Sequence, residues 1–266
     1  MVMKNNEILH VNNISKYFGG LAAVNNCTLK IKKGSITGII GPNGSGKTTL
    51  FNLIAGNLKS NKGSVIFNNE NITNMPSYKL FKKGLLRTFQ IAHEFSNLTV
   101  LENLMMVPSN QSGENLITAL VNPKLVKEEE EDIKMKAVEV IEFLNLKHLS
   151  NELAGNLSGG QKKLLELGRT MMVDAKLVLL DEVGAGVNRT LLKDLGTAIQ
   201  RLNTEKGYTF CMIEHDIDFI SRMCNPVIVM SEGSVLFEGT CDDVKKNEKV
   251  IDSYLGRGNK TNENVQ

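Results

Sequence analysis

One short segment limits the fold of this chain more than any other: a glycine-rich loop between an apolar run and a helical run. Residues 35–40 are largely apolar and β-branched, which predicts a buried strand. Residues 48–55 predict a helix that ends near Gly56. The loop consists of Gly41, Pro42, Asn43, Gly44, Ser45, Gly46, Lys47 and Thr48, followed by Thr49. A strand, such a loop and a helix in this order predict a phosphate-binding loop in an α/β fold.

The residue types in this loop suit a chain of phosphates. Glycines at 41, 44 and 46 let the backbone turn its N–H groups inward, and the helix N-terminus adds partial positive charge. Lys47 is expected to reach the β- and γ-phosphates, and the Thr48 hydroxyl to ligate Mg²⁺. A chance glycine-rich turn is the alternative, but the whole pattern and both flanks match. The loop alone leaves kinases, GTPases and other ATPases open.

A second apolar run, residues 176–180, ends in the two carboxylates Asp181 and Glu182. It predicts a central parallel strand, and ligands of open α/β sheets bind at the carboxyl ends of such strands. Asp181 is expected to hold Mg²⁺ through water, and Glu182 to act as general base or to orient the attacking water. An acidic turn that caps a strand is the alternative interpretation, and the loop upstream favours the functional one.

Two further segments gain meaning from that context. Residues 208–213 predict another strand, and His215 follows two residues later. In the stretch Leu-Ser-Gly-Gly-Gln at 157–161, Ser158 can cap a helix that begins near Gln161. The other histidines (His10, His93 and His148) have no such context and are interpreted as structural or solvated.

From about Ile8 to Gly256, the order of these motifs resembles the ATPase subunits of ATP-binding-cassette (ABC) proteins. The resemblance implies an α/β fold: a P-loop NTPase cassette with a mixed β-sheet core, an antiparallel β subdomain and a helical signature subdomain. It also implies an N-terminal extension at residues 1–7, an ABC ATPase domain at 8–256 with its helical subdomain at about 91–170, and a disordered tail at 257–266.

The resemblance assigns roles around the γ-phosphate. His215 matches the switch histidine, which contacts the γ-phosphate and holds Glu182 and the water in place. Gln90 matches the Q-loop glutamine, which senses Mg²⁺ and the γ-phosphate, so it is both a metal-binding and a catalytic candidate. ATP and Mg²⁺ are the implied cofactors.

Phe18 matches the aromatic residue that stacks on adenine, with Tyr17 as the nearby alternative, and Val24 is a further nucleotide-binding candidate. In the segment after Gln90, Phe95 and Leu98 match the region that contacts a membrane subunit, although core packing is an equal alternative for each. A helix is expected to start near Thr99.

In this family the signature of one subunit caps the ATP on another. Ser158, Gly159, Gly160 and Gln161 are therefore expected to bind nucleotide on a facing chain, with the helix N-terminus directed at it. The implied partner is a second copy of the chain or a second ABC ATPase subunit, in a two-fold arrangement with two composite sites.

Finer similarity points to one branch, the LivG type of ATP-binding subunit in branched-chain amino-acid importers. It lies in residues 18–24, 87–90, 97–104 and 250–256, and importers of urea, amides and other amino acids share it. The implied partners are membrane-spanning permease subunits and, indirectly, a periplasmic or extracellular solute-binding protein, with the chain peripheral on the cytoplasmic face of the membrane. The alternatives are the ATPase of a lipid or lipopolysaccharide exporter and a soluble non-transport ABC ATPase.

Two departures from the family pattern leave every catalytic group in place. Val183 stands where proline usually follows the catalytic glutamate, and Lys162 and Lys163 stand where arginine or glutamine is common.

Composition excludes some classes. The formal net charge of +2 over 266 residues gives no indication of a basic surface that would bind nucleic acid. The start of the sequence lacks the apolar core of a signal peptide, and no apolar run approaches the roughly 20 residues that span a bilayer. The four cysteines (Cys27, Cys211, Cys224 and Cys241) form no CxxC pair and predict reduced, partly buried thiols of a cytosolic protein.

The middle of the chain is expected to be helical. Ile133, Ala137, Val138, Ile141 and Leu144 predict one apolar stripe, with i, i+4 pairs of Glu130 with Lys134 and Asp132 with Lys136 on the other side. The acidic run at 128–132 predicts the solvated start of that helix.

Overall fold

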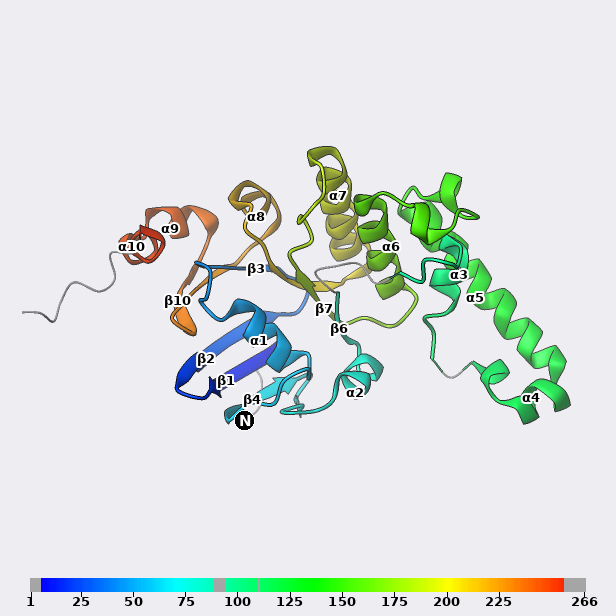
Figure 1. Ribbon diagram of the computed structural model, residues 1–266, viewed down its shortest axis with the longest axis horizontal. Helices are drawn as coiled ribbons and strands as arrows, with labels where there is room; N and C mark the ends of the chain where they lie inside the picture. Colours follow the sequence, from blue (N-terminus) through cyan, green and yellow to red (C-terminus); the bar gives the residue numbers. More distant parts are fainter. Residues whose placement is uncertain (1–5, 89–93, 110, 256–266) are drawn as a thin grey trace, which may run out of the picture. The chain divides into compact units, whose positions relative to one another are not determined.

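A computed structural model describes residues 6–88, 94–109 and 111–255, which divide into two compact units (Figure 1). Unit 1 comprises residues 1–87, 176–183 and 200–266, and unit 2 comprises residues 88–175 and 184–199. Helix α7 (Arg189–Lys206) contributes to both. The glycine-rich loop, Asp181, Glu182 and His215 belong to unit 1, whereas Ser158 belongs to unit 2.

A six-stranded mixed sheet forms the centre of unit 1, in the order β10-β9-β3-β8-β7-β6. The parallel strands are β9 (Val227–Ser231), β3 (Ile36–Ile40), β8 (Thr209–Ile213), β7 (Leu177–Asp181) and β6 (Leu85–Arg87). Strand β10 (Ser234–Gly239) pairs antiparallel with β9 at one edge. Strands β3, β7 and β8 are buried along their whole length, as their continuous apolar runs predict.

An antiparallel sheet of four strands, in the order β2-β1-β4-β5, forms a second layer of unit 1. Long strands β1 (Glu7–Phe18) and β2 (Leu21–Lys32) make a hairpin, and β4 (Lys62–Phe67) and β5 (Glu70–Asn71) follow. A turn joins β4 to β5 after Phe67, where Asn68 and Asn69 both adopt left-handed backbone angles.

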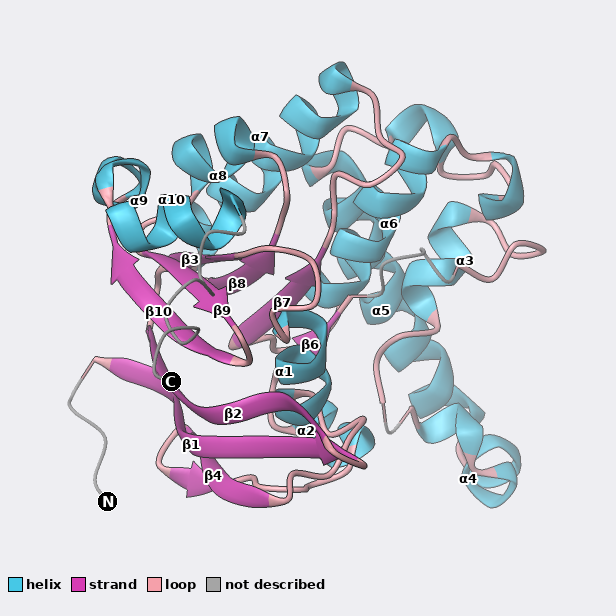
Figure 2. Ribbon diagram, turned by 60° about the vertical axis from the view of Figure 1, so that its left-hand side comes forward, coloured by secondary structure: helices cyan, strands magenta, loops and turns pink. Residues whose placement is uncertain are grey.

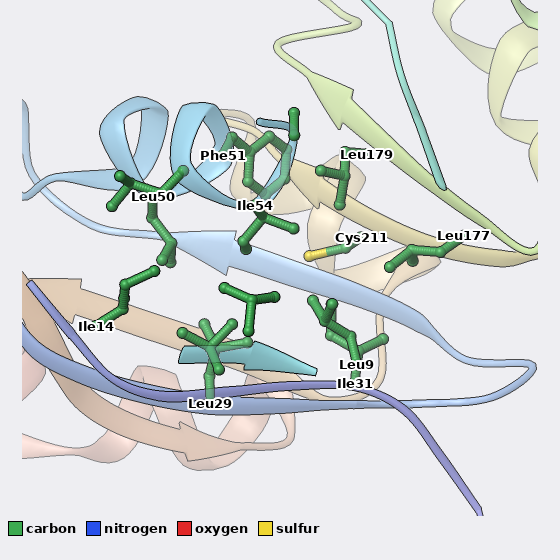
Figure 3. Close-up of a cluster of buried hydrophobic side chains, with 14 of the residues drawn as sticks. Leu9, Ile14, Leu29, Ile31, Leu50, Phe51, Ile54, Leu177, Leu179 and Cys211 are labelled. Carbon is green, nitrogen blue, oxygen red and sulfur yellow. The ribbon is translucent and has the colours of Figure 1, made fainter. Parts of the chain in front are cut away.

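Helix α1 (Lys47–Ile54) lies between these two sheets (Figure 2). Its side chains Leu50, Phe51 and Ile54 meet Leu9, Ile14, Leu29 and Ile31 from the antiparallel sheet and Leu177, Leu179 and Cys211 from the mixed sheet (Figure 3). A helix that is apolar on most of its circumference must be buried in this way. Together these side chains make one core cluster.

Short helices complete unit 1. Helix α2 (Ser77–Lys82) precedes β6; α8 (Ile217–Met223) packs on β3, and α9 (Cys241–Lys246) on β9 and β10. Helix α10 (Glu248–Leu255) contacts α9 and β10. Among the described residues, no helix combines the length and the apolar character needed to cross a membrane.

Unit 2 is helical in its described parts. It contains α3 (Val100–Met105), α4 (Leu116–Val121), α5 (Pro123–Phe143), α6 (Gly159–Met171) and 3₁₀ turns at Ser112–Glu114, Lys147–Leu149 and Ala154–Asn156. The helix expected near Thr99 starts there, capped by Thr99 in a capping box with Glu102. Asn103 is buried in α3 and ties down the preceding segment, with its Nδ2 group donating to the carbonyls of Phe95, Leu98 and Thr99.

Two expectations for helix α5 are wrong. Val138 is 40% exposed, and Val140 takes its place in the buried stripe with Ala137 and Ile141. Positions 133, 137, 140, 141 and 144 share one face at 100° per residue, and 138 does not. The acidic run is also not the start of the helix, which begins at Pro123 with Asn122 as N-cap.

The four cysteines are free and buried, as predicted for reduced thiols. Burial raises the pKa of the Cys27 thiol to about 12, and it raises the pKa of Cys224 to about 12 as well. Thiolate, the reactive form, is therefore scarce at these positions.

We expect Phe51→Ala to lower the free energy of unfolding by about 3–5 kcal/mol, because it opens a cavity at the centre of the core cluster. Chemical denaturation monitored by circular dichroism measures this. The control is Tyr78→Ala on α2, where the side chain is 63% exposed and the expected change is within about 0.5 kcal/mol. Equal effects of the two substitutions would contradict the central position of Phe51.

Candidate nucleotide-binding site

The glycine-rich loop leads directly from β3 into the N-terminus of α1, as predicted. Lys47 is buried, and its ammonium group Nζ donates to the carbonyls of Gly41 (2.8 Å) and Pro42 (3.0 Å). Ser45 Oγ lies 3.4 Å from the same Nζ. Thr48 is exposed in the first turn of the helix. The loop therefore encircles the lysine ammonium beside the positive end of a helix, which is a site for anions.

Gly46 holds the N-cap position of α1 with φ of 95°. A Cβ atom there would collide with the carbonyl oxygen of Ala23 and would lie 3.5 Å from Cγ2 of Val24. Gly44 also has a positive φ, of 80°, but within the described residues no atom lies near the position of its Cβ. Glycine is therefore needed at position 46 for two reasons: it adopts the left-handed backbone angle, and it leaves room for β2, which passes directly behind the loop.

The predicted adenine contacts lie on the same β1–β2 hairpin. Phe18 is 48% exposed at the end of β1, opposite Leu21, and Lys16 Nζ lies 5.2 Å from the centre of its ring. Tyr17 is partly buried. Val24 is fully buried against the loop, so its side chain supports Gly46.

The two carboxylates stand together at the carboxyl end of β7. Asp181 ends β7 and is 1% exposed. Glu182 follows with φ of 49°, an angle that is uncommon for a residue with a side chain and that concentrates at functional sites. Its N–H donates to the carbonyl of Ile213 on β8 at 2.9 Å. This bond fixes the strained residue to the strand that also carries His215.

His215 and Glu182 come together although 33 positions separate them in sequence. The Nε2 atom of His215 lies 2.9 Å from Oε1 of Glu182, within hydrogen-bond distance. Asp216 caps α8 directly after the histidine by accepting from the N–H of Phe219, which anchors this turn.

Burial is the main influence on the pKa of the Lys47 ammonium, and it lowers it. The negative charges of Glu182 and Asp181 act in the opposite direction and raise it. Lysine, aspartate and glutamate therefore share one electrostatic environment at this edge of the sheet.

Arg87 and Asn52 belong to this site too, although sequence reasoning assigned them no role in it. One guanidinium nitrogen of Arg87 donates to Asp181 Oδ2 and another to Asn52 Oδ1, each at 2.6 Å. Arg87 ends β6 beside β7. Two sequence signals could have indicated it: Arg87 opens the segment 87–90 that carries the family similarity, and it follows the apolar pair Leu85 and Leu86.

In unit 2, the signature stretch lies at the N-terminus of α6. Ser158 is the N-cap and forms a capping box with Gln161, whose Oε1 accepts from the N–H of Ser158 at 2.8 Å. The helix begins at Gly159, slightly earlier than predicted. Ser158 and Gly159 are exposed, whereas Gly160 is buried against Leu191.

Other predicted residues stand as follows. Gln90 and His93 lie outside the described residues. Lys162 pairs with Glu94 at 2.7 Å, and Phe95 is half exposed with Arg169 over its ring at 5.4 Å. Val183 is buried.

Three features define a nucleotide-binding cassette of the P-loop class. They are a core of parallel strands, a glycine-rich loop around a lysine after β3, and an aspartate–glutamate pair at the end of β7. The sequence comparisons give its family. The family model for the ABC transporter matches residues 24–185. The chain belongs to the ABC transporter family.

Individual relatives of this chain carry names that agree with this family assignment. The chain is 43% identical over 250 residues to a protein of Archaeoglobus fulgidus named "Probable branched-chain amino acid transport ATP-binding protein LivG", covering 94% of this chain and 96% of that protein. A protein of the same name from Methanocaldococcus jannaschii is 41% identical over 254 residues, with 94% and 98% covered.

Among solved structures, the ADP conformation of an ATP-binding cassette of an ABC transporter matches with a TM-score of 0.80 and 40% identity. The match covers 94% of this chain and 99% of that chain. The family resemblance, the fold class and the assignment as a nucleotide-binding ATPase cassette are thereby confirmed.

We expect Gly46→Ala to destabilise the chain by more than about 3 kcal/mol, because it adds a collision with Ala23 to an unfavourable backbone angle. Gly44→Ala is the matched control: it meets only the angle and should cost about 1–2 kcal/mol. Thermal unfolding without nucleotide compares the two. A Gly46→Ala chain as stable as Gly44→Ala would contradict the close packing of β2 behind the loop.

Proposed function

We propose that this chain is the ATP-hydrolysing subunit of an ABC importer for branched-chain amino acids or a related small polar solute. The relatives with 41–43% identity carry that transport function in their names. The chain would act as a peripheral subunit on the cytoplasmic face of a membrane, bound to permease subunits, with an external binding protein supplying the solute. The observation that carries the ATPase part is the pairing of His215 with Glu182 beside the lysine loop.

The loop and the N-terminus of α1 hold the phosphates. Lys47 exchanges its carbonyl partners for β- and γ-phosphate oxygens, which are charged and so make stronger hydrogen bonds. Backbone N–H groups of the first turn of α1 would face the same oxygens. Phe18 stacks on adenine, and Val24 supports the loop from behind.

The residues present fit a magnesium ion. Within the described part of the chain, Oδ1 of the buried Asp181 has no hydrogen-bond partner, and the Thr48 hydroxyl is exposed at the helix N-terminus. Both are oxygen donors, which Mg²⁺ prefers. Asp181 and Thr48, with Gln90, would hold the ion, which neutralises charge on the phosphates when bound.

Glu182 accepts a proton from the water that attacks the γ-phosphorus. The new bond joins the water oxygen to phosphorus, and the bond to the β–γ bridging oxygen breaks, leaving ADP and phosphate. His215 holds the Glu182 carboxylate at 2.9 Å and contacts the γ-phosphate.

A second cassette completes the site. The exposed N-cap Ser158 and the N–H groups of Gly159 and Gly160 offer a helix N-terminus to the γ-phosphate on a facing chain, and Gln161 keeps Ser158 in position through the capping box. ATP then favours the closed dimer because only that state provides both halves of the site. The facing chain is a second copy or a related ATPase.

We expect Glu182→Gln to reduce steady-state ATP hydrolysis at least 100-fold while ATP binding persists, because the amide keeps the shape but cannot take the proton. Phosphate release measures turnover, and size-exclusion chromatography with ATP should show trapped dimers. Exposed Glu205→Gln on α7 is the control and should leave turnover unchanged. Unchanged turnover in Glu182→Gln would refute the assigned role.

The transport assignment has its own test. A tagged copy purified from native membranes in mild detergent should carry two permease subunits and a second cassette protein, identified by mass spectrometry. The binding protein encoded nearby should then bind leucine, isoleucine or valine in calorimetry. A copy that carries no membrane protein, or only ribosomal or DNA-repair partners, would overturn the transport claim and leave the ATPase.

A further inference from the structure

Three polar side chains from three elements of unit 1 form one cluster, with the guanidinium of Arg87 bonded to the other two. Arg87 ends β6, Asp181 ends β7, and Asn52 lies in α1. The guanidinium of Arg87 donates to Asp181 Oδ2 and to Asn52 Oδ1, both at 2.6 Å. The side chains of Arg87 and Asp181 are 12% and 2% exposed. A charged pair this deeply buried needs several satisfied hydrogen bonds to persist.

Two buried atoms of this cluster have no hydrogen-bond partner among the described residues, Nε of Arg87 and Oδ1 of Asp181, and the second is the one that bears on metal binding. Of the two oxygens of Asp181, Oδ2 is bound to Arg87, whereas among the described residues nothing bonds Oδ1. A buried carboxylate oxygen without a partner is costly and calls for an explanation, such as an ion that binds there. The cluster thus fixes one oxygen of Asp181 and leaves the other available.

We propose that Arg87 is a positioning residue for the magnesium site: it anchors Oδ2 of Asp181, through its bridge to Asn52, so that Oδ1 is held ready for the metal ion of Mg-ATP. The inference rests on the proposed ATPase function, since the ion arrives with the nucleotide. Arg87 itself touches neither substrate nor metal.

The chemistry of arginine suits this role. Its planar guanidinium places two N–H groups in fixed directions, so that one side chain bonds Asn52 and Asp181 at the same time. Asn52 stands in the helix that follows the phosphate loop, five positions after Lys47. Arg87 therefore connects the metal-side carboxylate to the helix that holds the phosphates, and it sets the distance between them.

The test is a substitution that keeps the charge but loses the bridge. Arg87→Lys retains a cation, but a lysine ammonium lacks the planar fork that serves both acceptors. The readout is the Mg²⁺ concentration that half-saturates binding of a fluorescent, non-hydrolysable ATP analogue to the full chain. We expect that concentration to rise about ten-fold or more, as on loss of a group that orients a metal ligand. Affinity for the analogue without Mg²⁺ should stay within about two-fold.

Two further variants make the result specific. Asn52→Leu removes the second anchor of the guanidinium and should shift the Mg²⁺ requirement in the same direction by a smaller factor. Arg201→Lys is the matched control, because Arg201 pairs with Glu205 on the surface of α7, and it should leave the requirement unchanged. Thermal unfolding checks that each variant is folded. If Arg87→Lys does not fold, the Mg²⁺ requirement of Asn52→Leu tests the inference in its place.

An unchanged Mg²⁺ requirement in folded Arg87→Lys and Asn52→Leu overturns the inference while leaving the ATPase function intact. A lower requirement also overturns it, because the guanidinium would then compete with the metal ion. Nucleotide binding by the unmodified chain that is independent of Mg²⁺ overturns the role of Arg87, whereas an absence of Mg²⁺-dependent ATP hydrolysis by that chain overturns the proposed function itself.

Discussion

The burial of helix α1 between two sheets is the constraint on which the rest of the site depends. Leu50, Phe51 and Ile54 pack against both sheets, so the helix cannot rotate or slide without opening the core (Figure 3). Its N-terminus, with Lys47 and Thr48, is thereby fixed relative to the ends of β3 and β7. The few residues that join β3 to α1 must then turn through left-handed backbone angles, which explains the glycine at 46.

The parallel sheet supplies a second constraint, because it brings groups from distant parts of the sequence together at one edge. Strand β6 ends in Arg87 and strand β7 ends in Asp181. Strand β8 ends just before Glu214 and His215. Strand β8 acts twice, since the carbonyl of Ile213 holds the strained backbone of Glu182 and the next turn delivers the histidine. The strain at Glu182 persists because both the backbone and the side chain of that residue are held.

These two levels explain what could be predicted from sequence. The loop, its strand and its helix are local, so their residue pattern indicated them directly, and the family motifs supplied the pairing of His215 with Glu182. The bridge from Arg87 to Asp181 joins residues 94 positions apart, and no local pattern encodes it. The error at Val138 has a different origin: Val138 and Val140 are equally apolar, but the helical period places Val140 on the buried face and Val138 off it. The fold class was thus predictable from the sequence, whereas the contacts between distant residues of the site could be found only in the structure.

Charge balance at this edge bears on the proposal that a second cassette completes the site. Lys47 and Arg87 supply two positive charges, and Asp181 and Glu182 supply two negative ones. The triphosphate adds several negative charges, so on this count the described site lacks the cations to neutralise it. In the proposed function, a magnesium ion at Asp181 would offset part of this negative charge, and the N-terminus of a facing α6 would offset a further part with its partial positive charge. Once hydrolysis separates the γ-phosphate, that facing helix would lose the charge that attracted it. On this proposal, the same excess of negative charge that draws two cassettes together with ATP would let them separate after hydrolysis.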